Sequence, residues 1–247
     1  MKSYYLTDTG KVRSHNEDSV TIIKNASEEV LMVVSDGMGG HKAGEVASSL
    51  AVTHLGKRFS KLSSIGSIKD AVSWINDNVS EINEAILLYA RENVESKGLG
   101  ATLVLAIYTR DYLLFANIGD SSGFVYKNGK LFKVTKDHTL VNLLVEAGNI
   151  TEEEAKNHPK KNVLMKALGS NETLEADIFE TSPNVDGVLL CSDGLTNMLT
   201  KEQIEHTLNS SDTIENKVKM LIRKCNSRGG TDNISVAFID LKSGCEK

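Results

Sequence analysis

Several apolar stretches of this sequence end in an aspartate that stands beside glycine. The four cases are Asp36 in VVSDG, Asp120 in ANIGD, Asp193 in LLCSDG, and Asp232 in GGTDN, the last just ahead of an apolar stretch. The pair Glu17-Asp18 ends the segment DTGKVRSHNED. One Asp-Gly after a strand is typical of an ordinary turn. Four or five such carboxylates, however, can converge on one edge of a sheet stack.

Converging carboxylates favour a particular chemistry. Without partners they repel one another and raise each other's pKa. Hard cations such as Mg²⁺ or Mn²⁺ stabilise a cluster of oxygen ligands, and a glycine lets a backbone carbonyl approach the ion. Asp36-Gly37 can therefore supply one carboxylate and one carbonyl. Two cations that share a water make a nucleophile suited to phosphate-ester hydrolysis, and Arg13 near Glu17-Asp18 could hold the phosphate.

Composition excludes several other classes of protein. The 247 residues carry a formal net charge of -5 and 25% charged residues, and they show no Lys/Arg cluster. A nucleic-acid partner is therefore not expected. No apolar stretch approaches the ~18 residues of a membrane span, and the N-terminus has no apolar signal-peptide core. The three cysteines, Cys191, Cys225 and Cys245, form no C-x-x-C, so we expect a reducing, cytoplasmic compartment rather than disulfides or zinc.

Hydrophobic periodicity predicts the elements that must position these residues. Strands are expected where β-branched or alternating apolar residues run between turn signals: 19–25, 30–36, 101–109, 112–120, 123–127, 130–135, 162–168, 176–182, 187–193 and 233–241. Helices are expected where apolar residues recur every three to four positions: 43–62, a segment ending near 95, 139–148, 151–158, 200–208 and 212–226.

The order of these elements predicts the fold class. Strands come in runs and helices come in pairs, which differs from the strand-helix alternation of a parallel sheet. We therefore expect an α+β protein with mostly antiparallel sheets and helices packed on them. Because the sequence shows no linker, repeat or low-complexity segment, residues 1–247 are expected to form a single catalytic domain.

Seven segments together resemble the metal-dependent protein phosphatase family of the 2C type. They span nearly the whole chain in the family's order: TDTGKVRSHNEDS (7–19), VVSDGMGGHKAGEVAS (33–48), GLGATLVLA (98–106), ANIGDSSGFVY (117–126), NVLMKALG (162–169), LLCSDGLTNML (189–199) and GGTDNISV (229–236). The compact length and the segment DGMGGHKAG are most similar to bacterial members. The resemblance implies two stacked antiparallel sheets flanked by helix pairs, a four-layer sandwich, with residues 139–165 as a flap beside the active site.

The resemblance also implies a role for each carboxylate. Asp36 is expected to bridge two metal ions and Gly37 to bind one through its carbonyl. Asp193 and Asp232 would complete the shell of the other ion. Asp120, together with Asp193, matches the position that holds a third ion in many bacterial members.

The remaining expected roles concern water and substrate. Asp18 would hydrogen-bond metal waters, with Glu17 near the second ion, and Arg13 would clamp the substrate phosphate. The family mechanism is attack on phosphorus by a hydroxide that bridges two Mn²⁺ or Mg²⁺ ions, without a phosphoenzyme. The expected substrates are phosphoserine and phosphothreonine proteins, among them a eukaryotic-like Ser/Thr kinase that the phosphatase opposes, and we expect a monomer.

The sequence departs from the family pattern at three places. Met38 stands where eukaryotic members often carry a histidine proposed as general acid, so a metal-bound water or His41 could serve instead. His41 could equally be a structural hydrogen-bonding residue. Ser122 replaces the arginine of GDSR, which removes a local charge partner, and Ala101 replaces a threonine, for which we expect a packing consequence only.

Two other functions use the same residues. A pseudoenzyme would bind phosphoproteins without hydrolysing them, and the loss of Asp36, Asp193 or Asp232 would have favoured it. A metal-dependent phosphodiesterase or nuclease would use the same aspartate chemistry with a basic groove, which a net charge of -5 does not favour.

Overall fold

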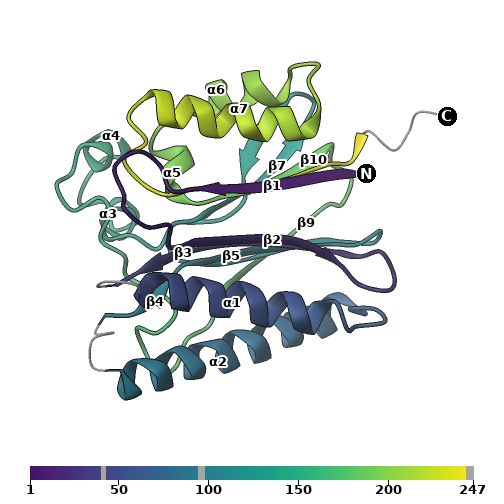
Figure 1. Cartoon of the computed structure of the whole chain (residues 1–247), viewed down its shortest axis with the longest axis horizontal. Coiled ribbons are helices and arrows are strands. Elements are labelled where there is room, and N and C mark those ends of the chain that lie inside the picture. Colours follow the sequence, from purple (N-terminus) through teal and green to yellow (C-terminus); the bar gives the residue numbers. More distant parts are fainter. Residues whose placement is uncertain (40–42, 94–97, 243–247) are drawn as a thin grey trace.

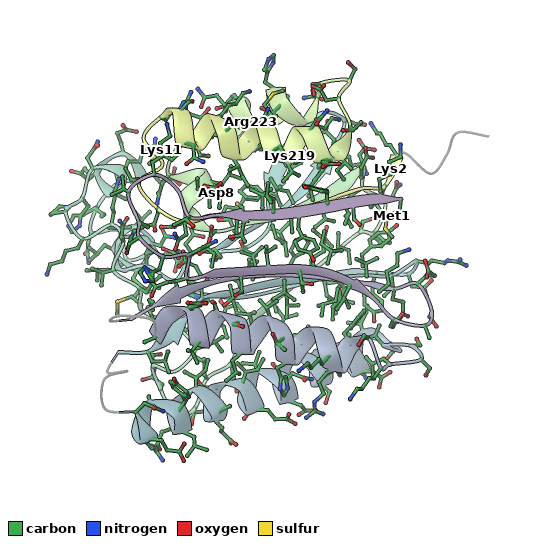
Figure 2. The ribbon with its side chains drawn as sticks, in the orientation of Figure 1. Met1, Lys2, Asp8, Lys11, Lys219 and Arg223 are labelled. Atoms are coloured by element: carbon green, nitrogen blue, oxygen red, sulfur yellow. The ribbon has the colours of Figure 1, made fainter. Side chains whose placement is uncertain are left out.

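The computed structural model describes residues 1–39, 43–93 and 98–242 of the chain. Helices and sheets form four layers, with two β-sheets face to face in the middle and helices on both outer sides (Figure 1). Side chains fill the space between the sheets and between each sheet and its helices (Figure 2). The predicted α+β sandwich of two stacked antiparallel sheets is thereby confirmed.

The first sheet contains both the first and the last strand of the chain. Its strand order is β1-β11-β10-β7-β8, and every neighbouring pair is antiparallel. The strands are β1 (Lys2–Asp8), β7 (Ser122–Lys127), β8 (Lys130–Lys133), β10 (Gly187–Cys191) and β11 (Ile234–Asp240).

The second sheet has the strand order β2-β3-β5-β6-β9, again antiparallel throughout. Its strands are β2 (Asp18–Lys24), β3 (Val30–Met38), β5 (Leu103–Tyr108), β6 (Leu113–Ile118) and β9 (Asp177–Thr181). The short strand β4 (Gly100–Ala101) pairs with the end of β3, where Gly37 lies opposite Ala101. This pairing continues β3 to Met38, so Asp36 and Gly37 lie at the C-terminal end of a paired strand.

Helices cover the outer face of each sheet. The helices α1 (Ala43–Phe59) and α2 (Ile68–Glu92) lie on the second sheet, and α5 (Asp193–Thr196), α6 (Lys201–Leu208) and α7 (Ile214–Ser227) lie on the first (Figure 1). Three apolar clusters separate the four layers: one under α1 and α2, one between the sheets, and one under α5 to α7. Burial of these clusters is the main force that holds the layers together.

The sequence of α2 explains why it forms where it does. Ser67 and Asp70 make a capping box at its start, and four apolar residues that recur every three to four positions are fully buried. These residues are Ile75, Val79, Ile82 and Ile86. We predicted this helix from the same spacing, although it ends at Glu92 rather than near residue 95.

Two short helices lie beyond one end of the sandwich, near α5 (Figure 1). They are α3 (Leu140–Glu146), capped by Thr139, and α4 (Glu152–Lys156), capped by the predicted box of Thr151 and Glu154. The predicted strand over 162–168 is wrong, because only Leu164 and Leu168 form single bridges, to Thr139 and Ala101.

Among the residues that the structure describes, no helix is both long and apolar enough to cross a lipid bilayer.

Candidate metal centre

Strand register brings Asp18 and Asp36 next to each other. The two residues are directly opposite in the antiparallel pairing of β2 and β3. Side chains of directly opposite residues point to the same face of a sheet, so the two carboxylates share that face. Like charges in this position repel, which costs stability unless something neutralises them.

Asp18 also links the two sheets. The Ser192 hydroxyl donates a hydrogen bond of 2.7 Å to Asp18 Oδ2, and Ser192 precedes Asp193 at the end of β10. The Ser235 N–H in turn donates to Ser192 Oγ at 2.9 Å. Asp18, from the second sheet, is therefore held by serines of the first sheet, and the position of its carboxylate depends on how the two sheets dock.

Thr102 fixes the backbone of Asp36. Its Oγ1 accepts the Asp36 N–H at 2.9 Å, and its own N–H donates to the Asp36 carbonyl at 2.8 Å. The next residue, Gly37, packs so closely on the start of α1 that an added Cβ would lie 2.1 Å from the Gly44 carbonyl oxygen. Only glycine fits there, and the Asp36-Gly37 peptide is consequently locked in place.

The first sheet contributes Asp193 and Asp232. Asp193 is the first residue of α5, and Asn197 Nδ2 donates to its Oδ2 at 2.9 Å. Asp232 lies just before β11, where its Oδ2 accepts from Arg13 Nη2 at 2.8 Å. Arg13 was predicted to clamp a phosphate. In the structure its guanidinium contacts the Asp232 carboxylate instead.

Asn233 joins the N-terminal loop to these residues. Its side-chain oxygen accepts the Glu17 N–H, and its Nδ2 donates to the carbonyls of Thr9 and His15, each at 2.9 Å. This one amide thus holds the loop that carries Arg13 and Glu17 against the start of β11. Asn233 was missed by the sequence analysis, as were Ser192 and Thr102, although all three stand next to, or pair with, a predicted ligand.

Burial and mutual repulsion raise the pKa of several carboxyl groups. Burial is the largest cause for Asp18 and Asp120, whose pKa values rise to about 7, and for Asp193, whose pKa rises to about 6. Burial and then the Asp18, Asp193, Asp120 and Asp232 charges raise the pKa of Asp36 well above its usual value. Burial also raises the pKa of Glu17, against the lowering effect of Arg13. Their mutual influence places these acids in one electrostatic cluster.

The predicted residues line one cleft, which we call the metal-site cleft. It measures about 540 Å³ and is lined by all of the predicted metal ligands as well as Arg13 and Glu17. These predicted ligands are Asp36, Gly37, Asp120, Asp193 and Asp232. Asp18 lies behind them, 6% exposed. A neighbouring flap-side cleft of about 590 Å³ shares Asp120, Asn162 and Asp193 and extends toward α3 and α4.

The donor set fits hard divalent cations. Three carboxylate oxygens are buried and have no hydrogen-bond partner within the described part of the chain: Glu17 Oε1, Asp18 Oδ1 and Asp193 Oδ1. A buried unpartnered oxygen is costly, and a cation or its bound water relieves that cost. Within residues 1–39, 43–93 and 98–242, no three His, Cys, Asp or Glu side chains already form a ready cage around one ion. Backbone carbonyls and waters would have to complete each shell.

Met38 and His41 are the two residues that bear on the general acid. Met38 lines the metal-site cleft, where its thioether can donate no proton. His41, the candidate general acid, lies outside the described residues.

The described cysteines, Cys191 and Cys225, are free and buried, and burial raises the pKa of Cys225 to about 12. No sulfur chemistry is therefore expected at these two positions.

Comparison with known proteins decides the family. The family model described as protein phosphatase 2C matches residues 10–228. The chain belongs to the protein phosphatase 2C family. It is 40% identical over 244 residues to the serine/threonine phosphatase stp of Listeria monocytogenes, covering 97% of this chain and 96% of that one. This family consists of metal-dependent hydrolases, so the chain stands among the metal-dependent serine/threonine protein phosphatases.

Solved structures of family members have the same architecture. The crystal structure of Stp1 from Staphylococcus aureus superposes with a TM-score of 0.91 at 36% identity, covering 97% of this chain and 94% of that one. The catalytic domain of the phosphatase PstP, in complex with two manganese ions, superposes with a TM-score of 0.82 at 32% identity and 97% coverage of both chains.

Proposed function

We propose that this protein hydrolyses phosphoserine and phosphothreonine on proteins at a centre of two or three Mn²⁺ or Mg²⁺ ions. The observation that carries the proposal is the convergence of Asp36 from one sheet with Asp193 and Asp232 from the other in a single cleft, with Asp18 buried behind them. Hydrolysis needs this many oxygens because two ions must be held a few ångströms apart. The two manganese ions in PstP support the assignment for a related protein.

Each residue has a proposed part in this centre. Asp36 and the Gly37 carbonyl would hold the two core ions, and Asp193 and Asp232 would complete one shell. Asp120 with Asp193 would hold the third ion. Bound ions would lower the pKa of a water between them, which is the chemistry that phosphate-ester hydrolysis at neutral pH needs. Asp18 and Glu17 orient waters around the ions through their free oxygens.

Arg13 is proposed to bind the substrate phosphate. It lies in the metal-site cleft with its side chain 51% exposed, so the guanidinium can turn from Asp232 toward an incoming phosphate. A guanidinium binds two phosphate oxygens at once, which orients the ester for in-line attack. The general acid for the leaving alcohol is either His41 or a water within the cleft.

The shape of the surface suits a polypeptide substrate. We propose that residues 1–247 act as one catalytic domain and that 139–165 form its flap. The flap-side cleft adjoins the metal-site cleft and runs under α3 and α4, which leaves room for the residues that flank a phosphoserine.

The net charge of -5 is unsuited to a nucleic-acid backbone. We further propose a cytoplasmic monomer that opposes a Ser/Thr protein kinase.

Phosphate release from a phosphothreonine peptide is the direct test. We expect release with Mn²⁺, loss of activity with excess EDTA, and recovery when Mn²⁺ is added back. A single-stranded oligonucleotide and a phosphodiester serve as competing substrates and should not be cleaved. Folded protein that binds Mn²⁺ but releases no phosphate would instead identify a phosphoprotein-binding pseudoenzyme.

A further inference from the structure

The turn that carries Asp120 is an unusual piece of backbone. Gly119 has φ +97°, a conformation that favours glycine, and an added Cβ would lie 2.6 Å from Thr102 Cγ2. The turn therefore packs directly against the residue that fixes Asp36. A small shift of Gly119 would move the Asp120 carboxylate relative to Asp36 and Asp193.

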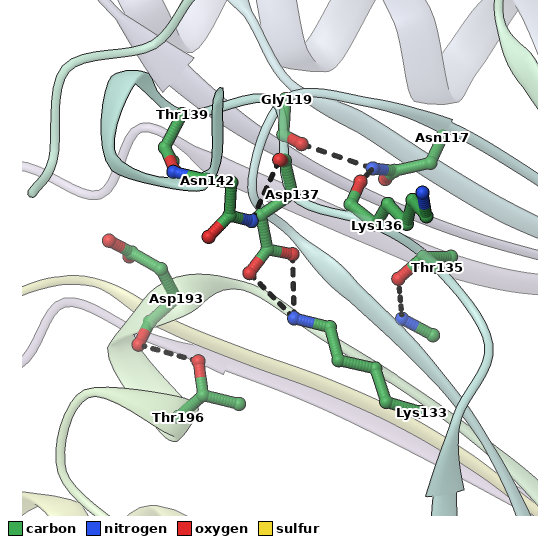
Figure 3. A network of polar contacts seen from close by, with 11 residues as sticks. Asn117, Gly119, Lys133, Thr135, Lys136, Asp137, Thr139, Asn142, Asp193 and Thr196 are labelled. Atoms are coloured by element: carbon green, nitrogen blue, oxygen red, sulfur yellow. Dashed lines mark hydrogen bonds and ion pairs between the residues drawn. The ribbon is translucent and has the colours of Figure 1, made fainter. Parts of the chain in front are cut away.

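Asn117 and His138 hold this turn through hydrogen bonds to Gly119. Asn117 Nδ2 donates to the Gly119 carbonyl at 3.0 Å and to the Lys136 carbonyl at 2.7 Å (Figure 3). His138 makes two further bonds to Gly119. The backbone N–H of His138 donates to the Gly119 carbonyl at 2.9 Å, and the ring Nδ1 of His138 accepts the Gly119 N–H at 3.0 Å.

The hydrogen bond from the Gly119 N–H to Nδ1 defines the tautomer of the His138 ring. Because Nδ1 accepts a hydrogen bond, the neutral ring carries its hydrogen on Nε2. Nε2 lies 3.1 Å from Asp177 Oδ2, within ion-pair distance, although the two atoms are not aligned as a regular hydrogen bond. Lys166 Nζ donates to the other oxygen of Asp177 at 2.7 Å. The ring, with its side chain 15% exposed, is thus held between Gly119 and a strand of the second sheet.

We propose that His138 is a positioning residue of the phosphatase centre: its Nδ1 holds the Gly119–Asp120 turn so that the Asp120 carboxylate faces Asp193. The Asp177 carboxylate, 3.1 Å from Nε2, favours the tautomer with its hydrogen on Nε2, which leaves Nδ1 to accept. Partners of this kind typically change metal affinity about 10–100-fold when removed. The inference rests on the proposed function, because Asp120 and Asp193 are the proposed ligands of the third ion.

Substitutions at His138 separate a hydrogen-bonding role from simple filling of space. His138→Asn keeps an acceptor at the position of Nδ1, whereas His138→Gln places its amide at the position of Nε2. We expect the weakest Mn²⁺ site, measured by titration with electron paramagnetic resonance of free Mn²⁺, to lose about tenfold or more in affinity in His138→Gln and His138→Ala. His138→Asn should stay within about threefold of the unsubstituted protein, because the acceptor is retained.

Two reference variants frame the result. Asp120→Asn should weaken the same site, and adding His138→Ala to it should have little further effect, because both act on one ligand. His54→Ala is the matched control, since His54 is also half-buried and hydrogen-bonded, to Asn78, but lies on α1. A second readout is hydrogen exchange at the Gly119 amide, which should be faster in His138→Gln than in His138→Asn.

The proposal is overturned if the weakest Mn²⁺ site is equally strong in His138→Gln and His138→Asn, or if the unsubstituted protein binds only two ions. Either result leaves the phosphatase assignment intact, because turnover of the phosphothreonine peptide is measured separately. Conversely, a protein without turnover whose weakest site still depends on the Nδ1 acceptor would overturn the phosphatase assignment and keep the positioning role.

Discussion

Arg13 Nη2 lies 2.8 Å from Asp232 Oδ2, so the proposed phosphate-binding group contacts a proposed metal ligand. The contact joins the loop after β1 to the residue that precedes β11. Both side chains are partly exposed, at 51% and 33%, and such ion pairs contribute little stability. We infer that the pair matters for where it places the guanidinium, in the metal-site cleft where the proposed substrate phosphate would bind.

Replacing Arg13 by alanine should weaken substrate binding more than catalysis. A charge-assisted hydrogen bond to phosphate is worth about 1.5–3 kcal/mol, so we expect KM for a small phosphate ester to rise about tenfold or more. Steady-state kinetics with para-nitrophenyl phosphate measures this directly. Arg91→Ala, which removes an exposed arginine paired with Glu172, is the control and should leave KM unchanged. An unchanged KM in Arg13→Ala would remove Arg13 from the phosphate site.

Asp193→Ala should abolish most activity, because it removes a proposed ligand of at least one essential ion. We expect turnover to fall by about 10²-fold or more, as for other losses of preorganised charge stabilisation. The fold should survive, since the substitution also relieves repulsion with Asp232. Thermal unfolding in EDTA should therefore be unchanged or raised, while the stabilisation by added Mn²⁺ should shrink. Near-normal turnover would contradict the site assignment.

The raised pKa values predict an unusual pH dependence in the metal-free protein. The carboxyls of Asp18 and Asp120 have pKa values of about 7 in the folded chain against an ordinary value of 3.8. The folded state thus binds these protons more tightly than the unfolded state. Their contribution to stability is present below about pH 4 and is lost as the pH rises to about 7.

This dependence can be measured by thermal unfolding in EDTA between pH 5 and about 8. We expect the unfolding temperature to fall more steeply with pH in the unsubstituted protein than in Asp120→Asn, which cannot titrate at this position. Mn²⁺ competes with the same protons, so its apparent affinity should increase over the same range. Identical slopes for the two proteins would contradict the raised pKa of Asp120.

Ser192→Ala should destabilise the fold and the centre together. The substitution leaves Asp18 Oδ2 without its donor and the Ser235 N–H without its acceptor, both in the interior. Unpartnered buried groups cost about 1–3 kcal/mol each, which denaturant unfolding can resolve. Ser73→Ala, on the outer surface of α2, should change the free energy of unfolding by less than about 0.5 kcal/mol.

Local sequence signals predicted most of the elements but not all of them. The apolar period identified α2 and α7, because each buries one continuous face on a sheet. The segment 162–168 looked like a strand, yet it makes single bridges at Leu164 and Leu168 because it crosses the end of the sandwich instead of joining a sheet. Strand β1 was not predicted, because it pairs with β11 at the other end of the chain, where Tyr4 lies opposite Phe238, and such a pairing leaves no local pattern.

The candidate site was predictable as far as its residues sit in recognisable motifs. Asp36 and Asp193 end apolar strands beside glycine, which is visible in the sequence. The residues that hold them are ordinary serines, threonines, asparagines and histidines, and their roles arise from contacts between distant segments. Asn233 meets Glu17, and His138 meets Gly119, only once the chain has folded.

The hydrogen bond from Ser192 to Asp18 has a consequence for how such an enzyme can be divided. Each half of the sandwich carries an incomplete set of acids: Asp18 and Asp36 belong to one sheet, and Asp193 and Asp232 flank strands of the other. Neither sheet alone carries all four acids, and the chain passes between the sheets more than once. No single cut of the chain therefore separates one sheet from the other, and turnover regained by a cleaved chain would report that the two sheets have docked again.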